Sequence, residues 1–452
     1  MQNEQDVGPL HERLTSALGS LQPLYQRKRV YGSVDVKGQG AGLLRAAVQA
    51  CDSCQDAISG AGAQHRHLLP LLLHLRGLAG YLQHGSTAAV RTQLEGAVKL
   101  APASVDAWNC LAHCHWEEKE LLLARCCLLS SLKACSNKEA MQMMSMLIRQ
   151  QVAGSSGPER SEALALSLQS AKAAIEIDVH DGFSWYVLAL AQLSQYLGGT
   201  ETFVPRSNAE RPRQLQRCLA SFSQAERCGI TALADLHYNR AALHTYCQSF
   251  GEALRDYAAA AMLDPGLPCQ AQTESLLMLV GQLSWLVSSR GGVNGKLWTR
   301  LTGLLARDAM KGAELLPHMY YEPLTLSSLL ALQPGVNKGK ALLCRPLVFL
   351  APSPQRLRNA VSLRPRLYLV CADTSGSCFA LALVRVAHDA FNLSQLLTVV
   401  NPELHEVEVN YKEQNYKFPM LKVDSLNTVL VEGIPIQQDT SAQLLHTCIT
   451  AG

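Results

Sequence analysis

The stretch GEALRDYAAAAMLDP at 251–265 indicates how most of the chain is built. Ala253, Tyr257 and Ala260 follow one another at helical spacing on one face, and Pro265 marks the end of the helix. Two helices pack closely only where their side chains are short, and a large side chain fills the gap between neighbouring helix pairs. The stretch therefore predicts the second helix of a packed helical hairpin.

The same pattern occurs upstream at a fixed distance. Cys218, Phe222 and Ala225 form a second small-aromatic-small set, and the offset from Phe222 to Tyr257 and from Ala225 to Ala260 is 35 residues in both cases. A period of about 34 residues is that of the tetratricopeptide repeat (TPR), a helical hairpin that stacks into a superhelix. Two positions that share one offset favour stacked repeats over an irregular helical bundle, which is the alternative.

Weaker copies of the hairpin precede these sets. Trp108, Leu111 and Ala112 fit the first-helix pattern, as do Trp185, Leu188 and Ala189. Trp108, Trp185, Phe222 and Tyr257 are therefore expected to be buried between hairpins. Further helical segments at 40–60, 68–83, 88–100, 139–152, 161–178 and 271–289 would complete about six hairpins and a closing helix.

The C-terminal part changes to short β-branched or aromatic runs, which predict about six strands. The runs are ALLCRPLVFL (341–350), LYLVCAD (367–373), CFALALVRV (378–386), LLTVV (396–400), VEVNY (407–411) and NTVLVE (427–432). An OB-type barrel is the most natural small closed sheet, and a mixed α+β sandwich is the alternative.

The predicted fold is thus an α-helical TPR solenoid followed by a small all-β OB-type barrel. The expected parts are an N-terminal helical segment at 1–35, the repeat superhelix at 36–320, the OB-fold domain at 336–437 and a flexible tail at 438–452.

Composition excludes several classes of protein. The 452 residues carry a formal net charge of +3, which is too small to indicate nucleic-acid binding by bulk charge. The fifteen cysteines are scattered in apolar stretches and are expected to be reduced. The polar N-terminus does not resemble a signal peptide, and the apolar stretch at 68–82 is too short to span a bilayer. The cytosol, the nucleus or both are the expected compartments.

No motif in the sequence supports catalysis. The glycine-rich RGGVNGK at 290–296 has too few residues between its glycines for a phosphate loop. Cys51 and Cys54 form one isolated pair without a second pair at zinc spacing. The sequence predicts a non-enzymatic protein without metal, cofactor or small-molecule substrate.

Several stretches are similar to the tetratricopeptide repeat protein 5 (Strap) family. They are 105–116, 135–150, 178–194, 235–244, 251–265, 332–337 and 396–437. The resemblance implies a TPR superhelix followed by an OB-fold domain. It also implies a stress-responsive cofactor of a histone acetyltransferase coactivator complex, and a ribosome-associated reader of nascent tubulin that triggers decay of tubulin mRNA.

The resemblance also implies a peptide site. A tubulin chain begins Met-Arg-Glu-Ile or Met-Arg-Glu-Cys, and in the family an arginine takes the Glu, here Arg149, while an aspartate faces the Arg, here Asp235. Arginine suits a bidentate contact with a carboxylate. The alternatives are that Arg149 is a solvated surface residue and that Asp235 is the N-cap of a helix beginning at Leu236.

The chain departs from the family at Cys269, where the family has an acidic residue, and Glu274 lies about one turn further along. This departure leaves a second function open, a scaffold for actin nucleation or transcription, partnered by an actin-nucleating cofactor, without tubulin recognition.

Basic residues mark candidate contacts with the ribosome or nucleic acid. Arg206, Arg211 and Arg213 lie in and after a long insertion, and Lys296 follows the last clear repeat. Solubility is the alternative explanation of such clusters. Base-stacking aromatics are sparse in the β region, which favours protein binding for that domain.

Overall fold

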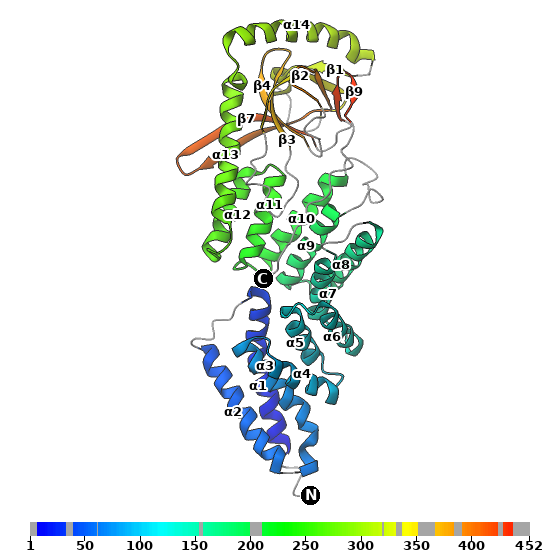
Figure 1. Cartoon of the computed structure of the whole chain (residues 1–452), viewed down its shortest axis with the longest axis vertical. Helices are drawn as coiled ribbons and strands as arrows, with labels where there is room; N and C mark the ends of the chain where they lie inside the picture. The colour runs from blue at the N-terminus through cyan, green and yellow to red at the C-terminus, as the bar shows by residue number, and fades with distance from the viewer. Residues whose placement is uncertain are drawn as a thin grey trace. The chain divides into compact units, whose positions relative to one another are not determined.

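The structure, a computed structural model, describes most of the chain (Figure 1). The described residues are 7–32, 39–60, 62–152, 157–198, 210–318, 321–330, 337–350, 367–383, 391–423 and 428–436. They divide into two compact units. Unit 1 contains α1 to α9 with residues 220–227 of α10, and unit 2 contains residues 210–219 of α10, α11 to α14 and the sheet.

Unit 1 is a series of helical hairpins behind two N-terminal helices. The N-terminal elements are α1 (Val7–Tyr31), α2 (Gln39–Gly60) and the short 3₁₀ helix η1 (Gly62–Leu68). The helices of the hairpins are α3 (Leu69–His84), α4 (Ala88–Leu100), α5 (Val105–Glu117), α6 (Leu121–Ala134), α7 (Lys138–Gln151), α8 (Pro158–Ile177), α9 (Gly182–Gly198) and α10 (Glu210–Arg227).

Short side chains allow the two helices of a hairpin to approach closely. A Cβ added at Gly77 of α3 would lie 2.6 Å from the side chain of Leu94 in α4, nearer than two carbons can approach. Ala112 of α5 and Ala124 of α6 have no exposed surface. Small residues, Ala112 of the predicted pattern among them, are therefore the contact points between paired helices, as the repeat pattern requires.

The two tryptophans differ from the prediction, because they are only partly buried. Trp108 packs against the edge of the unit 1 core, and its indole N–H donates to the Pro102 carbonyl at 2.9 Å. Trp185 donates in the same way to the Val179 carbonyl at 2.8 Å. Each indole N–H needs an acceptor, and the turn before the helix supplies one at the rim of the hairpin.

Unit 2 continues the repeat and then adds longer helices. Its helices beyond α10 are α11 (Ala234–Tyr246), α12 (Phe250–Leu263), α13 (Cys269–Ser288), the short η3 (Arg290–Gly292) and α14 (Gly295–His318). Ala241, Ala253 and Ala260 have no exposed surface, and Tyr257 is buried against Tyr238, which confirms the predicted hairpin. Because α11 begins at Ala234, Asp235 lies inside its first turn and is not the N-cap residue.

The C-terminal sheet has nine strands, more than the six expected. They are β1 (Glu322–Leu324), β2 (Lys340–Leu350), β3 (Leu367–Asp373), β4 (Cys378–Leu383), β5 (Leu397–Val400), β6 (Glu403–Tyr411), β7 (Gln414–Val423), β8 (Val429–Val431) and β9 (Ile434–Pro435). Three strands were not expected. β1 and β9 are too short to give a sequence pattern, and β7 contains Pro419, which argues against a strand. β1 also precedes residue 336, where the domain was expected to start, and the short helix α15 (Leu326–Leu330) follows it.

The strand order is β6-β7-β4-β3-β2-β5-β8-β9, with β1 pairing beside β2. Most neighbours are antiparallel, but β1 with β2 and β4 with β7 are parallel.

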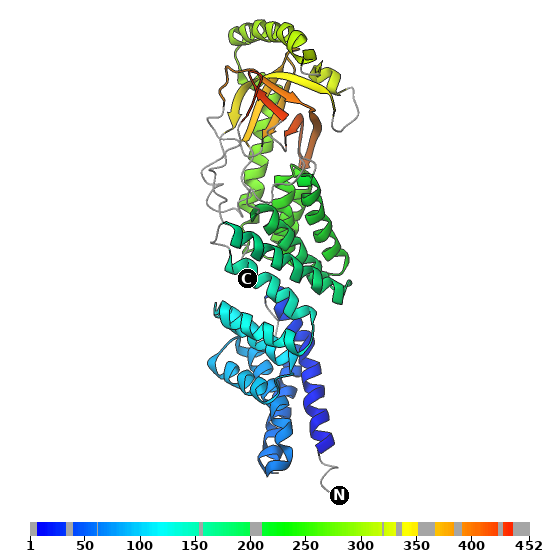
Figure 2. The same cartoon turned by 90° about the vertical axis from the view of Figure 1, so that its right-hand side faces the viewer.

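Both faces of the central strands are buried. Leu369, Cys371 and Phe379 belong to one cluster within the sheet, whereas Val370 and Ala380 pack on the opposite face against α12 and α13. Strand β3 therefore contains an unbroken apolar run instead of an alternating one. Figure 2 shows these helices beside the sheet from a second direction.

Helix α14 is fixed to the sheet by an ion pair. Arg345 of β2 contacts Asp308 of α14 with two nitrogens, at 2.5 and 3.0 Å. Gly312 allows the close approach, because an added Cβ would collide with the Leu343 side chain.

No helix among the described residues is long and apolar enough to cross a bilayer. The predicted tail at 438–452 lies outside the described residues.

Replacement of Tyr257 by Ala should lower the free energy of unfolding by about 3–5 kcal/mol, because the ring is 4% exposed and fills the space beside Tyr238. Met262→Ala is the matched control on the same helix, since Met262 is 87% exposed and its loss should change stability by less than about 0.5 kcal/mol. Urea unfolding of both variants checks the assignment, and equal stabilities would contradict it.

Candidate functional site

Helix α1 lies along the first helices of successive hairpins in unit 1 (Figure 2). Its contacts include Tyr81 of α3, Glu139 of α7 and Phe183 of α9. We call this side of the unit, formed by α3, α5, α7 and α9, the first-helix face. TPR solenoids commonly present an extended binding surface formed by successive repeats.

The end of α1 is held on this face by a buried polar network. Arg29 donates from Nη1 to Gln142 Oε1 at 2.7 Å, and its guanidinium lies 5.1 Å from the centre of the Phe183 ring. Gln26 Nε2 donates to Glu139 Oε2 at 3.0 Å, and Arg29 Nε lies 3.8 Å from Glu139 Oε1. The side chains of Arg29 and Glu139 are 4% and 9% exposed. This network occupies the part of α7 nearest its N-terminus.

Gln142 extends the network from α7 to α9. Its Nε2 donates to Asp181 Oδ2 and to Ser184 Oγ, both at 2.6 Å. Asp181 in turn accepts from the Ser184 backbone N–H at 2.8 Å. The start of α9 is thus fixed against α7 by satisfied hydrogen bonds, which gives the face a defined geometry.

Arg149 lies on α7 two turns beyond Gln142, so the two side chains share a face of the helix. Its Nη1 donates to Ser145 Oγ and to the Val187 carbonyl of α9, both at 3.3 Å. Burial lowers the pKa of Arg149 to about 10, so the group stays charged at neutral pH. Among the described residues no carboxylate lies within 4 Å of it.

The described hydrogen-bond partners of Arg149 are a hydroxyl and a carbonyl, and neither carries a charge. A desolvated cation is costly unless a charge or several acceptors balance it, and two long hydrogen bonds do so only in part. Arg149 is partly buried, which argues against the alternative that it is an ordinary solvated residue.

Asp235 is half-buried in the first turn of α11, in unit 2. Burial and then the nearby Asp264 carboxylate raise its pKa. No cation lies within 4 Å of Asp235 among the described residues, so a cationic group of a ligand would be favourable there. Arg149 belongs to unit 1 and Asp235 to unit 2.

The remaining predicted peptide-binding residue has a different environment. Glu274 is exposed on α13, where it accepts a hydrogen bond from Gln270 Nε2 at 2.9 Å. Cys269 is 1% exposed and packs with Tyr238 and Tyr257 in the core of unit 2. The thiol at this position is thus part of the packing between α11, α12 and α13.

Only some of the basic residues that were predicted to contact the ribosome or nucleic acid are among the described residues. Arg213 on α10 and Lys296 on α14 are exposed. Arg206 lies outside the described residues, and only the helical backbone of Arg211 is described.

Sequence reasoning missed the contacts of Arg29, Glu139 and Gln142. All three are polar residues on predicted helices, where a solvated face is the usual explanation. Arg29 and Glu139 are far apart in the sequence, and no local pattern indicates that they meet.

Comparison with known proteins gives matches to both parts of the chain. Residues 323–445 match the family model described as the tetratricopeptide repeat protein 5 OB fold domain. Tetratricopeptide repeat protein 5 of Homo sapiens is 32% identical over 363 residues, covering 78% of each chain. The protein of the same name from Mus musculus is 31% identical over 388 residues, covering 83% of this chain and 82% of the relative.

The helical repeats are also similar to solved TPR structures. A thermophilic TPR protein of Thermus thermophilus is 17% identical over 46% of this chain and 99% of that chain, with a TM-score of 0.36. That TM-score is too low to support a functional comparison.

Replacement of Arg29 by Met should lower the free energy of unfolding by about 3–5 kcal/mol, because it leaves the buried Glu139 carboxylate without its cation. Adding Glu139→Gln should restore part of the loss, since the amide carries no charge. Arg27→Met is the control, because Arg27 is an exposed residue of the same helix. Thermal unfolding measures all variants, and strict additivity of the two changes would show that Arg29 and Glu139 do not interact.

Proposed function

The chain belongs to the tetratricopeptide repeat protein 5 family, and from this premise we propose that it is an adaptor whose Arg149 binds an acidic side chain of a short, charged peptide. Membership of a TPR repeat family supports an adaptor or scaffold in preference to an enzyme. The proposal rests on one observation, a desolvated guanidinium with no carboxylate near it among the described residues.

The N-terminus of a nascent tubulin chain has the chemistry that this site requires. Its adjacent Arg and Glu would need a carboxylate and a cation, and Asp235 and Arg149 carry those charges. The raised pKa of Asp235, which follows from burial and from Asp264, indicates a carboxylate that would gain from a cationic ligand. We therefore propose recognition of nascent tubulin, and through it decay of tubulin mRNA, as the specific role.

Contact with the ribosome would accompany this role. Arg213 and Lys296 are exposed and would supply cations toward phosphate groups, with Arg206 and Arg211 beside them in the sequence. The family resemblance extends the proposal to a stress-responsive cofactor of a histone acetyltransferase complex. With both roles we propose that the protein acts in the cytoplasm and the nucleus.

A second function is favoured by Cys269. The thiol is buried between Tyr238 and Tyr257, in the place of an acidic residue of the family, and exposed Glu274 lies further along α13. A groove that lacks this carboxylate would hold the tubulin Arg less well. The alternative is therefore a scaffold for actin nucleation or transcription without tubulin recognition.

Arg149→Ala should weaken binding of a peptide that begins Met-Arg-Glu-Ile at least tenfold, because it removes the cation that faces the peptide Glu. Arg125→Ala is the matched control, since Arg125 is exposed on α6 of the same unit and should leave the affinity unchanged. Fluorescence titration with a labelled peptide measures both. If Arg149→Ala binds as tightly as the native protein, Arg149 is not part of the site and the tubulin proposal fails.

A further inference from the structure

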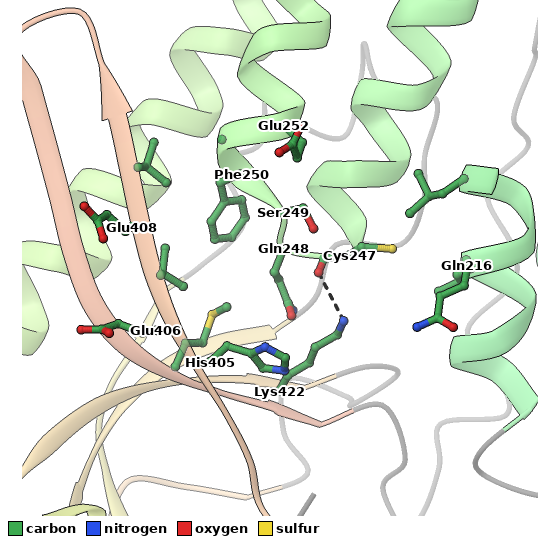
Figure 3. Close-up of a pocket in the computed structure, with 16 residues that line it drawn as sticks. Gln216, Cys247, Gln248, Ser249, Phe250, Glu252, His405, Glu406, Glu408 and Lys422 are labelled. Carbon is green, nitrogen blue, oxygen red and sulfur yellow. Dashed lines mark hydrogen bonds between the residues drawn. The ribbon is translucent and has the colours of Figure 1, made fainter. Parts of the chain in front are cut away.

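A pocket with a volume of about 520 Å³ lies within unit 2, between the repeat helices and the sheet (Figure 3). One wall is the middle of α10, the second is the turn from α11 to α12, and the third is strand β6 with β7 behind it. None of the residues proposed above to bind the tubulin peptide lines this pocket. It is therefore a separate cavity on the molecule.

The side chain of Gln248 lines this pocket without a hydrogen-bond partner. It is 8% exposed, and neither its Nε2 nor its Oε1 makes a hydrogen bond among the described residues. Figure 3 shows the amide directed toward His405 and Lys422, and the Lys422 ammonium already donates to the Cys247 carbonyl at 3.2 Å. A buried amide with both its donor and its acceptor unused is costly, and a ligand with both functions would satisfy it.

The backbone of Gln248 also has an unfavourable conformation. Its φ is +63°, and it ends α11 through hydrogen bonds from its own N–H to Thr245 O at 3.1 Å and from Ser249 N–H to His244 O at 2.9 Å. Glycine is the usual residue at such a helix end. Lys119 at the end of α5 has the same conformation, with a φ of +64° and the same pair of hydrogen bonds, so this backbone belongs to the hairpin turn. The unsatisfied side-chain amide is what distinguishes Gln248.

Strand β6 presents its free edge to the same pocket. It is the last strand of the sheet, so only one of its edges pairs with a described strand, β7. Five consecutive residues of β6, at 405–409, line the pocket. Because neighbouring side chains of a strand point to opposite faces, a pocket lined by consecutive residues runs along the strand edge. Alternate residues of an antiparallel strand direct their N–H and C=O groups away from the partner, here toward the pocket.

The side chains beside this edge differ between the two faces of β6. Val407 and Val409 are buried on one face in a cluster that includes Phe250 and Met420. Glu406 and Glu408 are exposed on the other.

The charged groups that line the pocket are mostly acidic. The carboxylates are Glu252 of α12, Glu406 and Glu408, and the possible cations are His405 and Lys422, which donates a hydrogen bond to Cys247 O. Glu252 also pairs with Arg255 on the exposed side of α12, where both side chains are at least half exposed and the pair is weak. Glu406 also pairs with Lys417 at 2.9 Å, but both side chains are more than half exposed and the pair is weak. Three carboxylates disfavour a phosphate backbone and favour a cationic ligand.

We propose that this pocket binds an extended peptide segment that pairs with β6, alternates basic and apolar side chains, and has a backbone amide that bonds to Gln248. A strand added beside β6 places its alternate side chains on the same two faces, so apolar residues meet Val407 and Val409 while lysines or arginines meet Glu406 and Glu408. The Gln248 amide supplies one donor and one acceptor, which match the C=O and N–H of the peptide. This site is additional to the tubulin-peptide site and does not depend on it.

The test uses the full chain and a labelled, end-blocked peptide of three Lys-Val repeats. The native protein should bind it saturably. Gln248→Met should weaken binding at least tenfold while stability is unchanged or increased, because the side chain keeps its size and loses its unsatisfied groups. Gln248→Gly should also weaken binding and should raise the melting temperature, since glycine suits a φ of +63°. Gln270→Met, at an exposed position on α13, should leave the affinity unchanged.

Two further arms test the mode of binding. The Lys-Val peptide is methylated on every second backbone nitrogen, either on the odd-numbered or on the even-numbered residues. One of these two peptides should bind at least tenfold more weakly, because its methyl groups replace the N–H groups that pair with β6. A peptide of three Glu-Val repeats should not bind. Arg149→Ala should bind the Lys-Val peptide as the native protein does, which separates this site from the tubulin-peptide site. The proposal is overturned if Gln248→Met leaves the affinity unchanged, if neither methylated peptide binds more weakly, or if an oligouridine displaces the peptide from the pocket.

Discussion

The close approach of paired helices at alanine and glycine positions is the constraint on which the rest of the structure depends. Gly77 of α3 meets Leu94 of α4, and Ala112, Ala124 and Ala253 have no exposed surface. A larger side chain at these points would separate the helices and open the stack. Because the paired helices lie close together, successive hairpins also stack closely. Polar residues on the first helix of one hairpin can then contact those on the first helix of the next. The first-helix face is a consequence of this packing.

Arg240, which is buried, and Arg149, which is partly buried, show the difference between a structural cation and a candidate binding cation. Arg240 contacts Asp256 through Nε at 2.7 Å and through Nη2 at 2.6 Å, and both side chains are about 90% buried. That pair is balanced within the fold. Arg149 is also desolvated, yet its described partners are a hydroxyl and a carbonyl at 3.3 Å, which are neutral. The contrast is the reason to propose recognition for Arg149 and to assign packing to Arg240.

The sequence predicts what depends on local periodicity, and it misses what depends on residues that meet only in the fold. Phe222 and Tyr257 are buried at the predicted offset, because the repeat imposes one environment on equivalent positions. Trp108 and Trp185 lie at the rim of their hairpins because their indole N–H groups need acceptors. The family pattern indicated Arg149, whereas its desolvation could be seen only with α9 in place. Gln248 had no such signal, since its pocket is completed by β6, far away in the sequence.

The central claim is that Arg149 recognises an acidic side chain by charge, and exchange of the charges tests it most directly. Two peptides, beginning Met-Arg-Glu-Ile and Met-Arg-Lys-Ile, are titrated against the native protein and against Arg149→Glu. The account predicts that the native protein prefers the first peptide and that the variant prefers the second, because the attractive pair is restored with its charges reversed. If both proteins prefer the same peptide, Arg149 does not face that residue and the account is wrong.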